Sequence, residues 1–298
     1  MSDQFTMQDP TKQYPTADEQ WKEQQSGPGL ETRMGPKPDA GEQTYRGTGR
    51  LTGRKAVVTG ADSGIGRATA IAFAREGADI VLSYLPEEEA DAQEVAQLVK
   101  DAGRTAVTAP GDLTDEAFCE QLIARTVSEL GGIDILVNNA GKQQHRTDIA
   151  ELSSEQFDET YKTNVYATFW LSKAAIAQMP PGATIINSTS VEAYTPAPIL
   201  VDYASTKAAI NTFTKALAQQ VAPKGIRVNA VAPGPVWTPL QVAGGQPEEA
   251  LAEFGEQTAL GRPGQPAELA PAYVFLASPE SSFVIGATLA VTGGMPTP

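Results

Sequence analysis

From Gly53 to Pro298, short apolar runs alternate with longer stretches whose apolar residues recur at helical spacing. Several runs, such as KAVVT (55–59) and IDILVN (133–138), are almost continuously apolar. Strands of this kind are typical of an α/β fold in which helices cover both faces of a parallel sheet. We therefore predict one doubly wound parallel sheet of about seven strands, at 55–59, 78–83, 105–110, 133–138, 183–188, 226–232 and 287–292.

The predicted helices occupy the intervals between these strands. They span 64–76, 87–102, 115–130, 153–179, 202–222 and 266–277. Thr114 is the predicted N-cap of the helix at 115–130, and Ser153 with Gln156 predicts a capping box at the start of the helix at 153–179. Cys119, in the middle of its helix, is expected in the core.

Residues 1–50 differ in composition from the rest of the chain. They contain no Val, no Ile and one Leu, against five Pro and six Gly. Such a segment cannot bury enough apolar surface to form a core of its own. We expect an extended N-terminal arm at 1–50, followed by a single domain at 51–298. The sequence leaves open whether the arm hangs free or packs through its candidate anchors, Tyr14, Trp21, Leu30, Met34 and Tyr45.

A glycine-rich turn, TGADSGIG (59–66), joins the first predicted strand to the first predicted helix. Glycines at the spacing G-x-x-x-G-x-G allow a tight turn and a close approach of backbone amides to a ligand. The helix N-terminus behind the turn offers unpaired N–H groups and a partial positive charge to a pyrophosphate. We therefore expect a Rossmann-type dinucleotide site, with contacts from Gly60, Asp62, Ser63, Gly64, Ile65 and Gly66.

Two later strand ends carry residues that suit the same ligand. After the third strand, the carboxylate of Asp112, next to Leu113, could accept a hydrogen bond from an adenine amine. After the fourth strand, Asn138 could hold a neighbouring loop. The residues that follow it are expected to let a ribose approach the backbone: Asn139, Ala140 and Gly141. Each signal also suits an ordinary turn, so the argument depends on their shared position at one edge of the sheet.

Tyr203 and Lys207 lie four residues apart, and Ser190 lies thirteen residues before the tyrosine. On a helix, this spacing places the phenol and the ammonium one turn apart on the same face. A phenol titrates near pH ~10, and a nearby positive charge favours the phenolate. Such a tyrosine can exchange a proton near neutral pH and is a candidate general acid or base. The spacing alone would equally suit an exposed pair on an amphipathic helix.

Taken together, these motifs resemble the short-chain dehydrogenase/reductase family. The matching elements occur in order over about residues 50–298: TGADSGIG, NNAG, Asn164, Ser190, YASTK (203–207) and PGPVWT (233–238). The arm, with its PGLE and PKPD stretches, is similar to that of a bacterial subgroup that includes aldehyde reductases and general stress oxidoreductases. The resemblance implies hydride transfer between NAD(P)(H) and an aldehyde, a ketone or the matching alcohol.

The resemblance also implies roles for the site residues. Tyr203 would be the general acid or base, Lys207 would lower its pKa and bind the nicotinamide ribose, and Ser190 would hold the substrate oxygen. Asn164 would take part in a water-linked proton relay to the lysine, with a solvent-facing asparagine as the alternative. The loop after the sixth strand would bring four residues to the nicotinamide carboxamide or the phosphates: Pro233, Gly234, Val236 and Thr238.

The segment at 239–254 contains glycines and is amphipathic, as expected of a mobile lid. Its apolar residues and the preceding tryptophan could either line a substrate pocket or pack the lid down: Trp237, Leu240, Val242 and Phe254. Residues 142–145 are expected near the pocket mouth, with His145 as a surface or pocket-wall residue rather than a catalyst.

The end of the second predicted strand, Ser83-Tyr84-Leu85-Pro86, bears on the choice of cofactor. A carboxylate at this position binds the ribose 2′-OH of NAD and repels the 2′-phosphate of NADP. No carboxylate occurs before Glu87, which favours NADP(H). No Lys or Arg is present there either, so NAD(H) stays open. Ser83 and Tyr84 are expected to contact the cofactor.

Charge and composition narrow the partners. With 22 basic and 36 acidic residues the net charge is −14, which argues against nucleic acid or an anionic membrane. One histidine and one cysteine argue against a metal site and a disulfide framework. The sequence shows neither a secretory signal nor an apolar run long enough to span a membrane. We therefore expect a cytoplasmic protein. The family resemblance implies a small-molecule substrate and a homotetramer.

Two other functions stay open from the sequence. The first is a sugar or polyol dehydrogenase, similar to glucose dehydrogenases, which works in the oxidative direction. The second is a sensor that binds the cofactor without turnover. A sensor need not keep Ser190, Tyr203 and Lys207 together, so their presence favours an enzyme.

Overall fold

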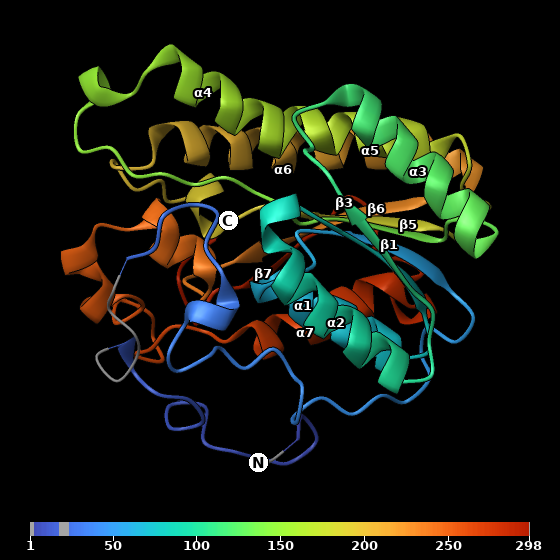
Figure 1. Ribbon diagram of the computed structural model, residues 1–298, viewed down its shortest axis with the longest axis horizontal. Helices are drawn as coiled ribbons and strands as arrows, with labels where there is room; N and C mark the ends of the chain where they lie inside the picture. The colour runs from blue at the N-terminus through green and yellow to red at the C-terminus, as the bar shows by residue number, and fades with distance from the viewer. Residues whose placement is uncertain (1–2, 18–23, 298) are drawn as a thin grey trace.

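The computed structural model describes residues 3–17 and 24–297, so the expected anchor Trp21 lies outside the described residues. Seven parallel strands form one sheet in the order β3-β2-β1-β4-β5-β6-β7 (Figure 1). The strands are β1 (Lys55–Thr59), β2 (Asp79–Tyr84), β3 (Ala106–Pro110), β4 (Ile135–Asn138), β5 (Thr184–Ser188), β6 (Arg227–Pro233) and β7 (Thr288–Val291). The predicted α/β fold with a doubly wound parallel sheet is confirmed.

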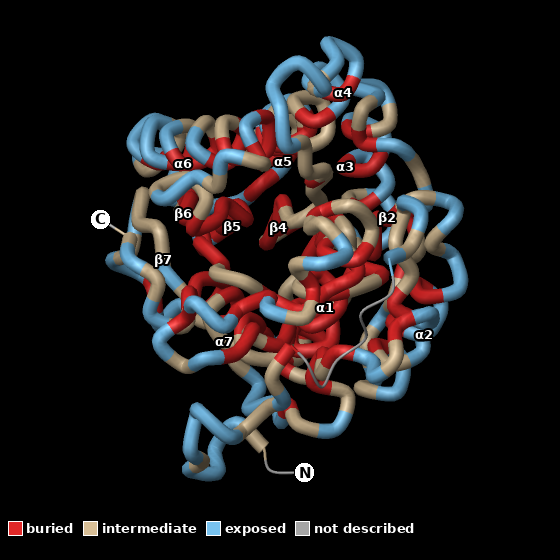
Figure 2. Tube along the Cα trace, turned by 90° about the vertical axis from the view of Figure 1, so that its left-hand side faces the viewer, coloured by how far each residue is buried: buried red, intermediate tan, exposed pale blue. Residues whose placement is uncertain are grey.

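Helices cover both faces of this sheet (Figure 1). One layer holds α1 (Gly64–Arg75), α2 (Glu89–Asp101) and α7 (Pro266–Ala277), and the other holds α3 (Glu116–Leu130), α4 (Ser154–Tyr161), α5 (Ala167–Ile176) and α6 (Val201–Val221). Successive strand residues enter opposite cores: Val58 packs against the first layer and Val57 against the second. Figure 2 shows central strands such as β4 and β5 buried between the two layers, which explains their continuous apolar pattern, whereas the edge strand β7 is only partly buried.

Helix N-termini follow the predicted signals in part. Asp115, not Thr114, caps α3, because its carboxylate accepts a hydrogen bond from the amide of Ala117. The prediction for Thr114 is therefore wrong. At α4, the hydroxyl of Ser153 accepts from the amide of Gln156 at 3.1 Å, as predicted. The Gln156 side chain instead donates to Asp202 of α6 at 3.2 Å, so the capping box is half formed.

The long helix predicted at 153–179 is interrupted. A π-helical turn, Lys162–Tyr166, separates α4 from α5, and Asn164 lies inside it. The Asn164 side chain accepts from the backbone amide of Lys142 at 2.7 Å and donates to Thr206 at 3.0 Å. These tertiary contacts draw the asparagine out of regular helical register, and π-turns of this kind are frequent at functional sites.

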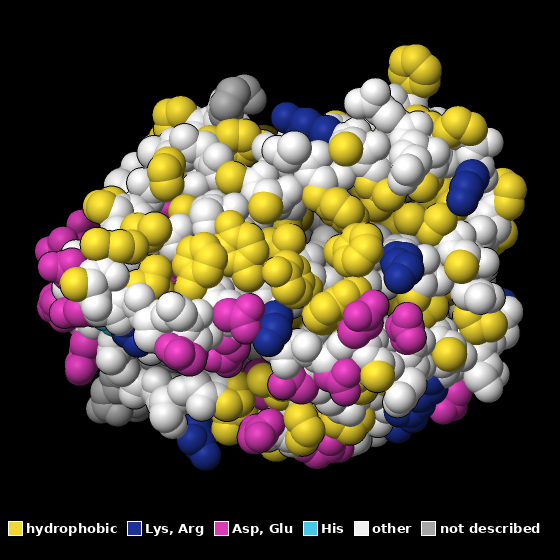
Figure 3. Space-filling model, turned by 90° about the horizontal axis from the view of Figure 1, so that it is seen from above, with side chains coloured by type: hydrophobic (Ala, Val, Ile, Leu, Met, Phe, Trp, Pro, Cys, Tyr) yellow, Lys and Arg dark blue, Asp and Glu magenta, His cyan; other side chains and the backbone are white. Residues whose placement is uncertain are grey.

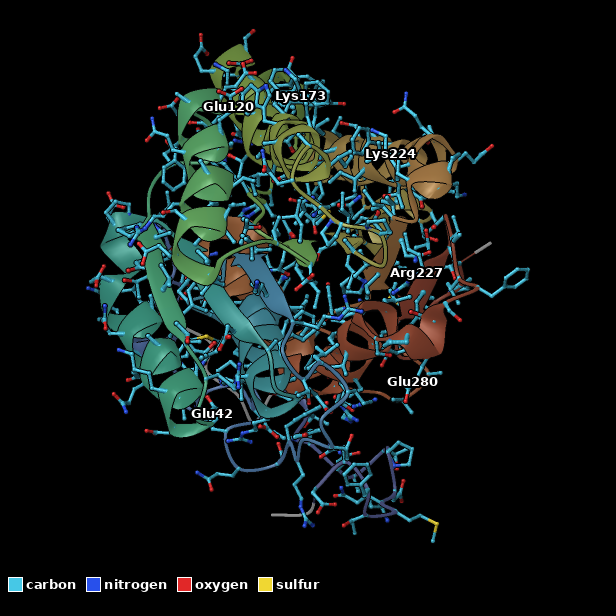
Figure 4. All side chains as sticks on the ribbon, turned by 90° about the vertical axis from the view of Figure 1, so that its right-hand side faces the viewer. Glu42, Glu120, Lys173, Lys224, Arg227 and Glu280 are labelled. Carbon is cyan, nitrogen blue, oxygen red and sulfur yellow. The ribbon has the colours of Figure 1, made fainter. Side chains whose placement is uncertain are left out.

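The described parts of the arm pack along the body instead of hanging free. The carboxylate of Glu76, at the end of α1, accepts from the Tyr45 hydroxyl at 2.6 Å and from Arg50 at 2.7 Å. Glu42, labelled in Figure 4, reaches Arg67 of α1 at 2.9 Å. Met34 and Tyr45 are buried, and Tyr14 and Leu30 are partly buried. The arm boundary at residue 50 stays a prediction.

The order of the strands reverses between β1 and β4, so the loops that follow these two strands diverge and leave a crevice. Every strand is parallel, and the loops after β1 to β6 therefore meet at one edge of the sheet. Within the described residues, no helix is long and apolar enough to cross a membrane.

Candidate active site

A cleft of about 930 Å³ runs along the carboxyl ends of the strands. Nineteen of the twenty-one predicted site residues line it, and the two exceptions are Gly66 and Asn164. The lining residues come from the carboxyl ends of β1 to β6, from the segments that follow them and from α6: Gly60, Asp62, Ser63, Gly64, Ile65, Ser83, Tyr84, Asp112, Leu113, Asn139, Ala140, Gly141, Ser190, Tyr203, Lys207, Pro233, Gly234, Val236 and Thr238. The fold thus brings the glycine turn and the Tyr203 helix to one cavity.

The glycine turn is built for close contact. Gly60 and Gly64 have φ values of 61° and 52°, where side chains are strained. A Cβ on Gly66 would lie 1.8 Å from the carbonyl oxygen of Gly60, and one on Gly64 would lie 2.9 Å from the methyl group of Thr238. Gly66 therefore keeps the turn tight from behind the cleft, while Gly64 lets the turn approach the loop after β6.

The same turn can hold an anionic ligand. It opens α1 at Gly64, and the first amides of a helix have no partner within the helix. Gly64 and Ile65 line the cleft at this helix terminus, where backbone donors and the helix dipole favour a pyrophosphate. The residues present therefore fit a dinucleotide, even though the chain as a whole is strongly acidic.

The loop after β4 is fixed to β1 and β5. The hydroxyl of Thr59 accepts from the amides of Asn139 and Ala140 at 2.9 and 3.0 Å. The sequence predicted that Asn138 holds a neighbouring loop; its side chain instead donates to Asn187 within strand β5 at 2.9 Å. The backbone of this loop is therefore presented to the cleft in one orientation, beside Gly60.

Tyr203 and Lys207 lie one turn apart on α6, as predicted, and both are nearly buried. The Lys207 ammonium donates to the carbonyl of Ser188 at 2.9 Å and lies 5.3 Å from the centroid of the Tyr203 ring. Burial lowers the pKa of Lys207 to about 8. Burial also raises the pKa of Tyr203 above its usual range, against the contact with Ser190. The phenol is therefore protonated at neutral pH.

Three neighbouring hydroxyls, Ser188 to Ser190, lie at the end of β5, and their contacts distinguish them. Ser188 hydrogen-bonds the hydroxyl of Tyr273 at 2.6 Å, and Thr189 donates to the carbonyl of Lys207 at 2.8 Å. Ser190 accepts from the amide of Glu192 at 3.1 Å, and its hydroxyl also contacts the Tyr203 phenol. Ser190 is thus the hydroxyl beside the phenol, whereas Ser188 and Thr189 brace the strand end.

Asn164 is buried and faces the interior rather than solvent. Its side-chain oxygen accepts from the backbone amide of Lys142 at 2.7 Å, and its side-chain NH₂ donates to the carbonyl of Lys142 at 3.0 Å. A Cβ on Gly141 would lie 3.5 Å from Asn164 Oδ1 and 3.5 Å from Lys207 Nζ. Asn164 therefore sits behind Gly141 and holds the β4 loop against α6.

The far end of the cleft is acidic. Asp62 of the glycine turn and Glu88, just after β2, both line it, and their carboxyl groups are in hydrogen-bonding contact. Burial raises the pKa of Asp62 to about 6, and burial together with the charge of Asp62 raises the pKa of Glu88 to about 8. The sequence analysis missed Glu88 because a 3-10 turn, Pro86–Glu88, returns it to the strand end.

Some apolar residues in and next to the lid segment (239–254) are buried beneath it, and others line the cleft. Trp237, Val242 and Leu251 are fully buried in a small cluster with Ala17 and Met34 of the arm. Leu240 and Phe254 line the cleft, so the two roles that the sequence left open are divided between these residues. His145 lies outside the lining and binds the carbonyl of Gly244. Cys119 is buried in the core, as predicted.

The arm also lines the cleft, which the sequence analysis missed. Gly27, Pro28 and Gly29 lie on its wall, and the nearby carboxylate of Glu31 accepts from the amide of Gly64 at 2.7 Å. No spacing signal could reveal these contacts, because they depend on the arm folding back onto the body. The lone leucine and the Pro-Gly stretch around Leu30 marked the segment only as a candidate anchor.

Comparison with known proteins gives a consistent result. The family profile described as Enoyl-(Acyl carrier protein) reductase matches residues 60–296, which include the glycine turn, Ser190, Tyr203 and Lys207. The chain is 56% identical over 288 residues to "Uncharacterized oxidoreductase YghA" of Escherichia coli (strain K12), covering 97% of this chain and 98% of that protein. It is 41% identical to "NADPH-dependent aldehyde reductase 1, chloroplastic" of Arabidopsis thaliana, covering 92% and 96%.

One solved structure adds a ligand to the comparison. A short-chain dehydrogenase from Burkholderia cenocepacia J2315, in complex with NADP, aligns with a TM-score of 0.76 and 33% sequence identity. The alignment covers 82% of this chain and 98% of that chain.

Proposed function

This chain belongs to the short-chain dehydrogenase/reductase family and is an NAD(P)-dependent oxidoreductase, and we propose that Ser190, Tyr203 and Lys207 carry its catalysis. The supporting observation is that one cleft joins the glycine turn to these three side chains. A sensor that only binds the dinucleotide has no need of a buried lysine beside a buried tyrosine.

In the proposed reduction, Tyr203 donates its phenolic proton to the carbonyl oxygen of the substrate. Its raised pKa keeps the phenol protonated at neutral pH, as a general acid requires. Ser190 hydrogen-bonds the same oxygen, and the Lys207 ammonium stabilises the phenolate that forms. The chemistry that the dinucleotide supplies when bound is hydride transfer. In the oxidative direction the phenolate takes the proton back.

Asn164 has a supporting place in this proposal. It lies across Gly141 from Lys207, and it holds the loop that would face the nicotinamide ribose. We assign it to the water-linked relay that returns a proton to Tyr203 through the lysine, as the sequence resemblance implies. The same contacts fix the distance between the β4 loop and α6.

The residues that would hold the cofactor follow from their positions along the cleft. The start of α1 at Gly64 and Ile65 would lie beside the pyrophosphate, and Asp112 with Leu113 would lie beside the adenine. Ala140 and Gly141 of the cleft lining would lie near the ribose, and Val236 with Thr238 would lie near the nicotinamide carboxamide. Each assignment is part of the proposal.

The observations on the choice between NADP(H) and NAD(H) point in opposite directions. The neighbour that binds NADP and the plant relative named for NADPH support the NADP(H) preference that the sequence favours. The carboxyl pair of Asp62 and Glu88 favours the 2′-OH of NAD(H). We propose that both cofactors are accepted, and that this acidic pair limits the preference for NADP(H).

The substrate end of the cleft favours an uncharged carbonyl compound. Leu200, Leu240 and Phe254 supply apolar surface, and Glu192 lies close enough to Tyr203 to raise its pKa further. A carboxylate there would repel an acidic substrate. An aldehyde or ketone without a negative charge suits this lining best, and aldehyde reduction is also the activity in the plant relative's name.

A sugar or polyol is the second candidate, and the same cleft gives a reason for it. Five glutamines line it: Gln143, Gln144, Gln241, Gln246 and Gln257. Their amides could bind several hydroxyl groups at once. This reading keeps the same catalytic residues and changes only the substrate.

We further propose a homotetramer. The face formed by α4, α5 and α6 gathers exposed hydrophobic side chains, visible from above in Figure 3. Phe157 of α4 is 41% exposed, Tyr166 of the π-turn 44% and Phe169 of α5 46%. A patch of this kind is typical of a contact between subunits. Cytoplasmic location stays a sequence-based prediction.

The test is a substrate screen in which the absorbance of the reduced nicotinamide reports turnover. Aldehydes and ketones are tested with NADPH and NADH, and sugars and polyols with the oxidised forms of these cofactors. The proposal expects turnover of uncharged aldehydes or ketones, and weaker turnover of matched keto acids. If only sugars or polyols react, the second candidate replaces the first. If no substrate reacts although the cofactor binds, the assignment of Ser190, Tyr203 and Lys207 is contradicted.

A further inference from the structure

The N-terminal arm reaches the cleft through one stretch, residues 24–34, which we call the arm segment. The amide of Gln25 donates to the carbonyl of Val242 at 2.8 Å, and the Gln24 side chain donates to the carbonyl of Gln246 at 2.8 Å. Both acceptors belong to the lid segment. A Cβ on Gly29 would lie 2.7 Å from the carbonyl oxygen of Pro239, so the two backbones touch.

The same stretch then reaches the glycine turn. Glu31 is fully buried, and its Oε2 accepts from the amide of Gly64 at 2.7 Å. The Glu31 carboxylate therefore caps the first turn of α1, while the N-cap residue Ser63 makes no capping hydrogen bond. Its Oε1 lies 3.2 Å from Arg67 Nε, but burial outweighs this contact and raises the pKa of Glu31 to about 8. The amide of Gly64 is thus already bound next to the amides that face the cleft.

Further contacts hold the arm segment in place. Asp91 of α2 accepts from the amides of Glu31 and Thr32, at 2.6 and 3.1 Å. Met34 is buried against the lid in the cluster with Trp237 and Val242. An arm that only covered the surface would not need a buried carboxylate at the cofactor turn. The arm segment is therefore tied at one end to the lid and at the other end to the glycine turn.

We propose that the arm segment is a positioning element of the cofactor site, in which Glu31 sets the glycine turn through Gly64 and the stretch 24–29 holds the lid segment over the cleft. The inference rests on the proposed function for the position of the dinucleotide. Binding of the dinucleotide and closure of the lid are coupled through the arm. Loosening the arm at either end weakens cofactor binding and exposes the lid, even though the arm touches no reacting atom.

Gly29→Ala tests the lid end. The new methyl group cannot fit beside Pro239 and Ala243 without moving the arm off the lid. Thr32→Ala is the matched control, because the Thr32 side chain is exposed and only its amide is used. We expect Gly29→Ala to raise the Kd for NADPH and for NADH about fivefold and to speed amide exchange across 239–254, with Thr32→Ala unchanged.

Glu31→Ala and Glu31→Gln test the other end. The alanine removes the acceptor for the Gly64 amide and should raise both Kd values about fivefold. The glutamine keeps an acceptor oxygen and should recover most of the affinity. A purely structural role would lower Tm in Glu31→Ala and leave Kd as in wild type, which would overturn the inference.

Amide exchange of the wild-type protein supplies a test that needs no variant. Saturating NADPH should slow exchange in the arm segment and the lid segment together. If the cofactor protects the glycine turn while 24–34 and 239–254 exchange as before, the inference is wrong. If the wild type binds neither NADPH nor NADH, the proposed function fails with it. If it binds both and Gly29→Ala and Glu31→Ala bind equally well, only the arm's role fails.

Discussion

The ammonium of Lys207 lies 5.3 Å from the ring centroid of Tyr203 and donates a hydrogen bond to the carbonyl of Ser188 at 2.9 Å. The lysine is therefore fixed by the end of β5, one helical turn from the phenol. A fixed buried cation is a stronger electrostatic partner for a phenolate than a mobile surface lysine. If Tyr203 is the proton donor, as proposed, the charge state of Lys207 directly determines the activity.

The alkaline limit of activity should follow Lys207. Burial lowers its pKa from the usual 10.5 to about 8, so its positive charge is present below pH 8 and is lost above it. We expect kcat/KM for carbonyl reduction to fall as the pH rises through about 8. Lys207→Arg keeps a positive charge to much higher pH and should move the remaining activity's alkaline limb upward. An unchanged alkaline limb in Lys207→Arg would assign that limb to another group.

Cofactor preference should respond to Glu88. Above pH 8, where Glu88 with its pKa of about 8 is ionised, the Glu88→Gln change removes a negative charge from the pair with Asp62, next to the expected position of the ribose 2′ group. We expect the ratio of kcat/KM for NADPH to that for NADH to rise about tenfold. Glu87→Gln, at the exposed neighbouring position, is the control and should leave the ratio unchanged. A ratio that stays constant in Glu88→Gln would place the 2′ group elsewhere.

The junction between arm and body should be sensitive to acid. Burial alone would raise the pKa of Glu76, but hydrogen bonds from Arg50 and Tyr45 outweigh it and hold the pKa at about 2. Its stabilising contribution is thus present above the usual value of 4.5 and is lost as the pH falls from 4.5 towards 2.

Glu76→Gln should lower the free energy of unfolding by about 3 kcal/mol at pH 7, since it removes the nearer and buried charged partner of Arg50 and leaves only Glu280 at 3.7 Å. Urea unfolding of wild type and variant, at neutral and at low pH, measures both effects. The difference between them should shrink at low pH, because wild-type Glu76 is then protonated as well. An equal difference at both pH values would show that the charge of Glu76 adds nothing.

The apolar helix face should control assembly. Phe169 is 46% exposed on α5, and Phe169→Glu would place a charge in the proposed contact between subunits. We expect a tetramer for the wild type and a smaller species for the variant, by light scattering coupled to size exclusion. Lys224→Glu, exposed beyond the end of α6, is the control. A monomeric wild type would contradict the proposed homotetramer.

Local patterns sufficed for the sheet and for the catalytic candidates. Continuous apolar runs fixed the strands, and the spacing of Tyr203 and Lys207 fixed their shared helix face, because both depend on residues close in sequence. The glycine turn could be predicted for the same reason.

Features that depend on distant contacts could not be predicted. The π-turn at Asn164 follows from hydrogen bonds to Lys142 and Thr206, far away in the chain. Glu88 returns to the cleft only through the turn after β2, and Glu31 reaches Gly64 only when the arm lies along α1. In each case the position of the side chain depends on how the folded chain packs, and the residues next to it in the sequence do not reveal that position.

The central claim is that Tyr203 transfers the proton, and Tyr203→Phe tests it most directly. The variant keeps the ring that packs on α6 and removes only the hydroxyl group. The measurement compares its turnover with its Kd for NADPH, on a substrate that the wild type reduces. The account predicts that kcat falls by a factor of about 10³ or more while Kd stays within about twofold. Turnover close to that of the wild type, with intact NADPH binding, would contradict the mechanism.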